Sequence, residues 1–127
     1  MSTLSKKKIL IVDDEPHTLL LLQTRLEMND YEVVTASDGI ECIEKTLEEK
    51  PDLIVLDIMM PNKDGFSTLR ELKNNEVTKH IPVILLSARG EMDLLDKGEA
   101  LGAADYFIKP YESTELLKYI KRYLGTS

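Results

Sequence analysis

Three aspartates stand at the points where two short apolar runs of the chain end. Asp13 and Asp14 follow the apolar run 9–12, and Asp57 follows the apolar run 53–56. If these runs are neighbouring parallel strands, their carboxyl ends bring the three carboxylates into one crevice. Carboxylate oxygens packed together repel one another, and a hard divalent cation with oxygen ligands relieves that repulsion. The pattern therefore predicts a site that holds Mg²⁺ beside a carboxylate.

Two more polar residues follow apolar runs later in the chain. Ser87 comes directly after the run 83–86, and Lys109 comes directly after the run 106–108. In an open parallel sheet, the working site lies beyond the carboxyl ends of the strands, where the strand order reverses. We therefore expect Ser87 and Lys109 to join the aspartates at that edge. Each residue taken alone has an ordinary alternative, because aspartate and serine are common turn residues and a lysine before Pro110 can be a surface side chain.

The segments that must position these residues alternate between two patterns. Short β-branched apolar runs alternate with longer helical patterns, and turn residues separate them, which is typical of an α/β sheet. We predict strands at 8–12, 32–36, 53–56, 83–86 and 105–108, and helices at 16–28, 38–49, 65–74, 91–101 and 113–124. Residues 32–36 are the least hydrophobic of the strands, which suits an edge. Right-handed crossovers would then cover both faces of a parallel sheet with helices.

Length and composition narrow the classes of protein to consider. The 127 residues suit one domain spanning 1–127, with residues 1–7 as a basic tail. The net charge of −7 argues against a surface that binds nucleic acid, because phosphates repel acidic proteins. The single cysteine, Cys42, cannot form an internal disulfide, and no apolar stretch is long enough for a signal peptide or a membrane span. We therefore expect a cytoplasmic protein without membrane contact.

The chain resembles the receiver domain of two-component response regulators, and single-domain receivers in particular. The motifs that carry the resemblance are Ile-Val-Asp-Asp-Glu at 11–15, the segment 53–65 around Asp57, Pro-Val-Ile-Leu-Leu-Ser-Ala at 82–88, and Asp-Tyr-Phe-Ile-Lys-Pro at 105–110. They occur in the order and spacing of the family over nearly the whole chain. The resemblance implies a flavodoxin-like (βα)5 three-layer sandwich with strand order 2-1-3-4-5.

The resemblance also implies what the acidic residues do. Asp57 would be the phosphoacceptor, which takes a phosphoryl group from a histidine kinase or a histidine phosphotransferase in a phosphorelay. Mg²⁺ would be held directly by Asp14 and Asp57, by Asp13 through water, and by the main-chain carbonyl of Met59. Because Mg²⁺ keeps several waters, few protein ligands are expected. The domain would be a signalling phosphoacceptor whose only catalytic activities are its own phosphorylation and dephosphorylation.

Further roles follow from the same resemblance for residues on the other side of the crevice. Lys109 would supply positive charge to the phosphoryl oxygens, and the Ser87 hydroxyl would donate to one of them. Tyr106 occupies the position of the aromatic switch residue, and the alternative is a fixed, half-buried tyrosine. The family usually has a cis peptide bond after the lysine, and Pro110 permits one.

Two surfaces are candidates for partner binding. The helix 91–101, the strand 105–108 and the helix 113–124 would form the face that signals to a downstream protein. On the last helix we expect an outward face formed by Lys118, Tyr119 and Arg122, with Tyr119 as a candidate contact. Four consecutive leucines, 19–22, cannot all face the sheet because each advances about 100° around a helix.

The first helix therefore predicts a docking surface for the partner that carries the donor histidine. If positions 19, 22 and 26 are core, Leu21 points outward beside Thr18 and Arg25. An exposed leucine near the aspartates fits a helix of a kinase or phosphotransferase. The alternative is a lone surface leucine, which is ordinary in folded proteins.

Two positions bear on the lifetime of a phosphorylated aspartate. Met59 and Arg89 lie two residues beyond Asp57 and Ser87, where side chains can overhang a phosphoryl group and obstruct water. We predict slow self-hydrolysis for this reason.

Alternative functions and the output of the domain stay open at this point. A haloacid-dehalogenase-type phosphatase also uses an aspartyl nucleophile with Mg²⁺, but it requires Asp-x-Asp, whereas the chain has Asp57-Ile58-Met59. A flavin- or nucleotide-binding module would need a glycine-rich loop after the first strand, where the sequence is Asp-Asp-Glu. No output segment follows residue 124, so we expect either a free-standing receiver or one cut from a larger regulator or hybrid kinase.

Overall fold

The computed structural model describes residues 6–59 and 64–125, in which five strands alternate with five helices. The strands are β1 (Lys8–Val12), β2 (Glu32–Ala36), β3 (Leu53–Asp57), β4 (Val83–Ser87) and β5 (Asp105–Ile108). The helices are α1 (Pro16–Glu27), α2 (Gly39–Glu49), α3 (Gly65–Lys73), α4 (Met92–Ala100) and α5 (Ser113–Leu124). Residues 1–5 of the expected basic tail and residues 60–63 of the motif at 53–65 lie outside the described residues.

The strands form one parallel sheet in the order β2-β1-β3-β4-β5. This order confirms the doubly wound α/β fold and the expected edge position of β2. The chain first moves from β1 outward to β2 and then crosses back to β3, so the strand order reverses between β1 and β3. Ligand sites of open parallel sheets lie beyond the carboxyl ends of the strands at such a reversal.

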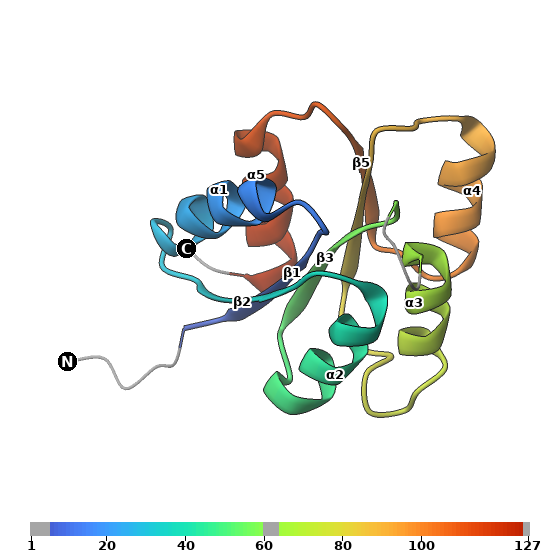
Figure 1. Cartoon of the computed structure of the whole chain (residues 1–127), viewed down its shortest axis with the longest axis horizontal. Helices are drawn as coiled ribbons and strands as arrows, with labels where there is room; N and C mark the ends of the chain where they lie inside the picture. The colour runs from blue at the N-terminus through green and yellow to red at the C-terminus, as the bar shows by residue number, and fades with distance from the viewer. Residues whose placement is uncertain (1–5, 60–63, 126–127) are drawn as a thin grey trace.

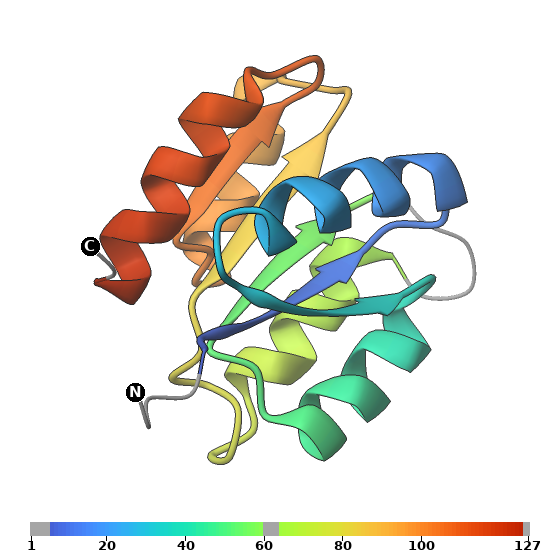
Figure 2. The ribbon, with the colours of Figure 1, turned by 90° about the vertical axis from the view of Figure 1, so that its left-hand side faces the viewer.

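Helices cover both faces of the sheet and make a three-layer structure (Figure 1). Helices α1 and α5 lie on one face, and α2, α3 and α4 lie on the other, while Figure 2 views the sheet from the α1 and α5 side. The side chains of β1 lie alternately on the two faces of the sheet, because successive strand side chains point in opposite directions. Ile9 and Ile11 pack with buried residues of α1 and α5, whereas Leu10 and Val12 pack with residues of α2 and α3.

The central strands β1, β3 and β4 are apolar apart from Lys8, Asp57 and Ser87 at their ends, because both faces of these strands are covered. Ile54, Leu56 and Leu85 are completely inaccessible to solvent. Replacing one such residue with alanine typically costs about 2–5 kcal/mol, through lost burial and the cavity that remains. Cys42 of α2 is also buried in this core and is a free thiol. Burial raises the pKa of its thiol to about 12, which agrees with a packing role.

Local signals in the sequence account for the helix boundaries. Pro16 occupies the first turn of α1 and Gly102, at a φ of 99°, follows the end of α4, as the preferences of proline and glycine predict. Asp38 caps α2 by accepting from the Glu41 amide at 2.8 Å. The Glu41 carboxylate in turn accepts from the Ser37 amide at 2.7 Å, one residue before the cap. Among the described residues, no helix is long and apolar enough to cross a membrane.

Candidate functional site

Three polar residues lie at the carboxyl ends of the three central strands. Asp13 directly follows β1, while Asp57 and Ser87 are the last residues of β3 and β4. Both β3 and β4 are therefore one residue longer than the apolar runs alone predict. All three side chains are buried, which is uncommon for aspartate unless it is paired or bound to a cation.

The three residues share one local hydrogen-bond pattern, in which the side chain accepts from the amide two residues further along. Oδ1 of Asp13 accepts from the Glu15 amide at 2.9 Å, Oδ1 of Asp57 accepts from the Met59 amide at 2.9 Å, and Oγ of Ser87 accepts from the Arg89 amide at 3.0 Å. Short polar side chains favour this turn geometry. The turn fixes one oxygen of each carboxylate and leaves the other for a partner across the crevice.

Lys109 reaches both buried carboxylates across the sheet. Its Nζ donates to Oδ2 of Asp57 at 2.7 Å and to Oδ2 of Asp13 at 3.2 Å. The backbone amide of Lys109 donates to the Ser87 carbonyl at 2.7 Å, and the peptide bond to Pro110 is cis. Burial lowers the pKa of Lys109, but the hydrogen bonds and charges of Asp57 and Asp13 outweigh that effect and raise it. The ammonium therefore stays charged at neutral pH.

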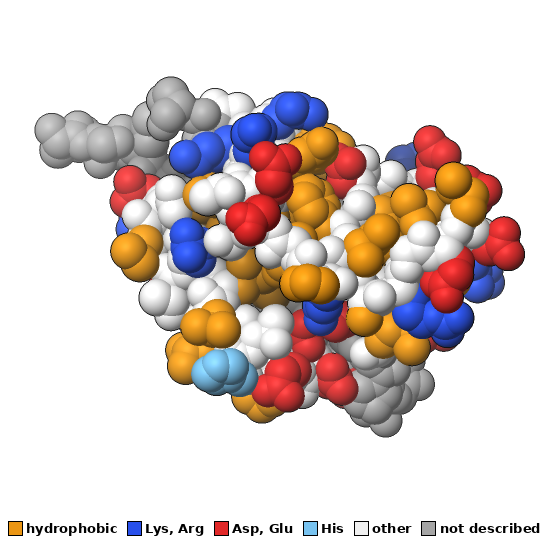
Figure 3. Space-filling view, turned by 90° about the horizontal axis from the view of Figure 1, so that it is seen from above, with side chains coloured by type: hydrophobic (Ala, Val, Ile, Leu, Met, Phe, Trp, Pro, Cys, Tyr) orange, Lys and Arg blue, Asp and Glu red, His pale blue; other side chains and the backbone are white. Residues whose placement is uncertain are grey.

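Asp14 completes a group of three carboxylates. One oxygen from each of Asp13, Asp14 and Asp57 lies within 4.8 Å of the others, and Asp14 is exposed to solvent. Burial and the nearby charge of Asp57 raise the pKa of Asp13, despite the Glu15 amide and Lys109. Three carboxylates against one ammonium leave two negative charges. A hard divalent cation that prefers oxygen ligands fits this donor set. Acidic side chains gather beside a basic one in the lower middle of Figure 3.

Gly65 holds the start of α3 against the end of β3. A Cβ atom at this position would lie 2.4 Å from the Ile58 Cα and 2.9 Å from the carbonyl oxygen of Asp57. Both are backbone atoms and cannot rotate away, so only glycine allows this approach. The Gly65 amide donates to the Ile58 carbonyl at 3.1 Å. This contact fixes the backbone that follows Asp57 on the site edge.

Tyr106 connects β5 with the loop that follows Ser87. Its side chain is half-buried, and its hydroxyl donates to the Arg89 carbonyl at 2.8 Å. The Arg89 guanidinium itself pairs with the Glu91 carboxylate at 2.9 Å. The Met59 side chain is exposed next to Asp57. The loop after β4 is therefore tied to Ser87 through the Arg89 amide and to Tyr106 through the Arg89 carbonyl.

Helix α1 presents Leu21 to solvent, as its periodicity predicts. Leu21 is 61% exposed, whereas Leu22 and Leu26 are buried. Beside Leu21 lies a hollow of about 310 Å³, which is lined by Thr18, Leu21, Leu22, Arg25, Tyr111 and Ser113. The last two residues were missed by the sequence reasoning. They follow Lys109 closely, so the rule that places Lys109 at this edge would also have found them.

The expectation that Tyr119 is exposed on α5 is wrong. The residue is half-buried, and its ring packs edge-on against Phe107 of β5 at a centroid distance of 5.1 Å. The guanidinium of Arg122 lies over the Tyr119 ring, 4.7 Å from its centroid. Lys118 and Arg122 are exposed as expected. Tyr119 is therefore a packing residue between α5 and the sheet.

Comparisons with known proteins agree with this geometry. The response regulator receiver domain family matches residues 9–121. The alkaline phosphatase synthesis transcriptional regulatory protein PhoP of Bacillus subtilis is 43% identical over 121 residues, covering 95% of this chain and 50% of its own length. The phosphate regulon transcriptional regulatory protein PhoB of Pseudomonas aeruginosa is 41% identical, covering 93% of this chain and 52% of its own length. The chain thus spans about half the length of these curated relatives.

Solved structures give the same result. A putative response regulator from Chloroflexus aurantiacus superimposes with a TM-score of 0.89 at 30% identity, covering 95% of this chain and 99% of its own. The chemotaxis protein CheY4 of Vibrio cholerae superimposes with a TM-score of 0.87 at 30% identity, covering 92% and 98%. Neither the phosphatase alternative nor the flavin- or nucleotide-binding alternative gains support. The chain belongs to the receiver domain family of the two-component response regulators.

Proposed function

We propose that Asp57 accepts a phosphoryl group from a phosphohistidine of a sensor histidine kinase or a histidine phosphotransferase. The single observation that carries this proposal is the position of its carboxylate, which is buried at the end of β3 and held by the Met59 amide and by Lys109. A buried carboxylate with fixed orientation and a neighbouring cation is prepared for nucleophilic attack.

The reaction is an in-line displacement at phosphorus. A carboxylate oxygen of Asp57 forms the bond to phosphorus, and the bond to the histidine nitrogen breaks with the electron pair leaving on the nitrogen. With a small acyl phosphate as the donor, the phosphorus–oxygen bond breaks instead and a carboxylate leaves. Lys109 moves its hydrogen bond from Oδ2 of Asp57 to the phosphoryl oxygens. The Ser87 oxygen already accepts from the Arg89 amide, so its own proton remains for donation to the phosphoryl group.

Mg²⁺ is the metal that we propose for the carboxylate group. Asp14 and Asp57 would hold it directly, Asp13 would act through water, and the Met59 carbonyl would supply another oxygen. When bound, Mg²⁺ offsets charge on the phosphoryl oxygens during transfer. This proposal is supported by the all-oxygen donor set and by its two uncompensated negative charges. The domain, which we take to span residues 1–127, would catalyse only its own phosphorylation and dephosphorylation.

Phosphorylation replaces the single negative charge of the Asp57 carboxylate with an acyl phosphate that carries roughly −1.5 to −2, and we propose that Tyr106 transmits this change. The Ser87 hydroxyl would donate a hydrogen bond to the new phosphoryl oxygens. The Ser87 oxygen also accepts a hydrogen bond from the Arg89 amide. Tyr106 holds the carbonyl of the same residue. A shift of this loop therefore changes the Tyr106 contact and the surface formed by α4, β5 and α5. That surface would contact a downstream protein target, without direct contact to nucleic acid.

We propose that the donor protein docks on α1, at the surface formed by Leu21, Thr18 and Arg25. We place this contact in the cytoplasm, without membrane contact. The exposed face of these three residues borders the 310 Å³ hollow near the β5–α5 connection, which suits an apolar side chain of a partner helix. Leu21→Glu should slow transfer from a phosphorylated histidine phosphotransferase and leave labelling by acetyl phosphate unchanged. Met28→Glu, at an exposed residue just after α1, is the matched control and should leave both reactions unchanged.

Incubation with acetyl phosphate and Mg²⁺ tests the proposed function. We expect an intact-mass gain of one phosphoryl group per chain, which a metal chelator prevents and which alkaline hydrolysis removes. No mass gain under these conditions, or an equal gain in the presence of the chelator, would contradict the proposal.

A further inference from the structure

The outer surface of α2 and of the α3–β4 loop carries exposed apolar side chains that belong to no part of the proposed site. Ile40 is 53% exposed, Leu47 is 44% exposed and Val77 is 59% exposed. Ile40 and Leu47 are seven residues apart and share one side of α2. Ile43 lies between them and is partly buried against the core. Ile40 and Leu47 thus form an exposed apolar strip along α2, next to the partly buried Ile43.

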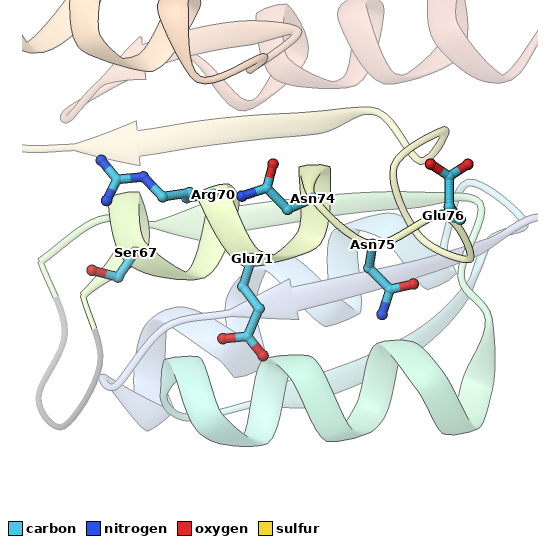
Figure 4. Close-up of a pocket in the computed structure, with 6 residues that line it drawn as sticks. All are labelled: Ser67, Arg70, Glu71, Asn74, Asn75 and Glu76. Carbon is cyan, nitrogen blue, oxygen red and sulfur yellow. The ribbon is translucent and has the colours of Figure 1, made fainter.

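Three neighbouring hollows lie along α3 and beside these apolar residues. A hollow of about 780 Å³ on α3 is lined by Ser67, Arg70, Glu71, Asn74, Asn75 and Glu76 (Figure 4). Glu71 and Asn75 also border a narrow hollow against Ile43 and Leu47. Thr78 connects this hollow to a third one of about 210 Å³ beside Val77. Shared residues link the three hollows into one shallow groove, whose middle part is narrow, with a volume of about 10 Å³.

The groove has an acidic rim. Glu44 and Glu48 are exposed on α2, and Glu71 and Glu76 are exposed on the opposite side. Figure 4 shows the Glu71 side chain directed from α3 towards α2. Arg70 and Lys50 also line the hollows, and Lys79 pairs with Glu76 at 2.8 Å in an exposed pair that solvent screens. The four glutamates together with Asp52, which lines the hollow beside Val77, outnumber these three cations by two. Exposed apolar side chains within an acidic rim call for a cationic, partly apolar partner.

We propose that this α2–α3 face, formed by Ile40, Leu47, Val77 and the rim of Glu44, Glu48, Glu71 and Glu76, docks a basic amphipathic helix of a partner protein. Apolar side chains at helical spacing would fill the groove, and lysine or arginine side chains would pair with the glutamates. Helix α2 has 11 residues, about three turns, which matches a short partner helix. A second copy of this chain is disfavoured, because it would bring one acidic rim against another.

This face is separate from the surfaces used in phosphoryl transfer. The donor protein is proposed to dock on α1, and the phosphorylated state is proposed to signal through α4, β5 and α5. The α2–α3 face therefore provides a third contact, which does not require phosphorylation of Asp57. This proposal rests on peptide binding to the α2–α3 face, whereas the proposed function rests on labelling of Asp57. The two can therefore fail independently.

The test uses the full chain and a synthetic helical peptide of leucine and lysine, with leucines along one side. Amide chemical shifts of the protein are followed during titration with this peptide. We expect the largest shifts in residues 40–48 and 71–78, reduced by salt. Two control peptides should leave these residues unshifted: one of the same composition in scrambled order, and one with glutamate in place of lysine.

Matched variants make the result decisive. The Leu47→Lys and Glu44→Lys double variant should weaken peptide binding by at least about tenfold, while its dispersed amide spectrum and unchanged acetyl phosphate labelling show an intact fold and phosphoacceptor site. Met28→Lys, at another exposed apolar residue, should bind the peptide as the wild type does. The proposal is wrong if the shifts fall mainly on α1, if the scrambled peptide binds equally well, or if the double variant keeps wild-type affinity.

Discussion

The Nζ atom of Lys109 lies 2.7 Å from Oδ2 of Asp57, although 52 residues separate them in the sequence. The same ammonium also binds Asp13. Lys109 is thus the protein's own counter-charge for two buried carboxylates.

Replacing Lys109 with methionine keeps the aliphatic chain and removes the ammonium. We expect the free energy of unfolding to fall by about 2 kcal/mol, because two buried carboxylates lose their cation. The loss is smaller than for a fully buried pair, since the Lys109 side chain is 28% exposed and solvent screens its charge. Added Mg²⁺ should raise the melting temperature more in this variant than in the wild type. Thermal unfolding with and without Mg²⁺ measures both effects. Lys118→Met, which breaks an exposed pair with Glu115, should have little effect; equal Mg²⁺ responses of the wild type and Lys109→Met would refute the prediction.

Tyr106→Phe removes the hydroxyl that donates to the Arg89 carbonyl and keeps the ring. We expect a loss of about 1 kcal/mol, the typical net contribution of one hydrogen bond. Amide hydrogen exchange in residues 88–91 should become faster, whereas acetyl phosphate should still label the protein. Unchanged exchange in this loop would show that the hydroxyl does not hold it.

Small side chains at positions 59 and 89 should shorten the life of the acyl phosphate. Met59 is exposed beside Asp57, and Arg89 pairs with Glu91 within the β4–α4 loop. Met59→Ala with Arg89→Ala should speed self-hydrolysis about tenfold, or roughly 1.4 kcal/mol in the barrier. Loss of the acyl phosphate in Mg²⁺ buffer gives the rate. A rate close to that of the wild type would contradict the idea that these side chains obstruct water.

Stability at alkaline pH should depend on Tyr123. Its hydroxyl lies 2.6 Å from Oδ2 of Asp105 and 2.9 Å from the Ala104 carbonyl oxygen. Burial, followed by the hydrogen bond and charge of Asp105, raises the pKa of Tyr123 from 10.0 to about 12. The unfolded chain loses this proton first, so the stabilisation is complete below pH 10 and is lost as the pH rises towards 12.

Urea unfolding across this pH range checks the sign. Tyr123→Phe should be less stable than the wild type at pH 8, and the difference should shrink between pH 10 and pH 12. A difference that grows with pH in that window would show that the folded state does not retain the proton.

Strand pattern and topology explain why much of the site could be predicted from the sequence. Polar residues after apolar runs reach the same edge in any parallel sheet, so Asp13, Asp57, Ser87 and Lys109 converge as expected. The runs predicted β3 and β4 one residue short, because backbone pairing continues through Asp57 and Ser87. Helix α4 is shorter than predicted, since Glu91 and Leu101 cap it rather than belong to it.

Tertiary contacts explain what could not be predicted. The periodicity of α5 places Tyr119 towards solvent, but Phe107 of β5 packs against its ring, and no pattern within one helix reports that contact. The same applies to the bond from Tyr106 to Arg89, which joins residues 17 positions apart. The groove between α2 and α3 also depends on how two helices pack side by side.

Mapping the labelled residue decides whether Asp57 is the phosphoacceptor. After acetyl phosphate treatment with Mg²⁺, the wild type should carry one phosphoryl group on the peptide that contains Asp57, and Asp57→Asn should carry none. Asp64→Asn changes a nearby exposed aspartate that caps α3, and it should be labelled as the wild type is. Labelling of Asp57→Asn to the wild-type extent, or a phosphoryl group on any other residue of the wild type, would contradict the account.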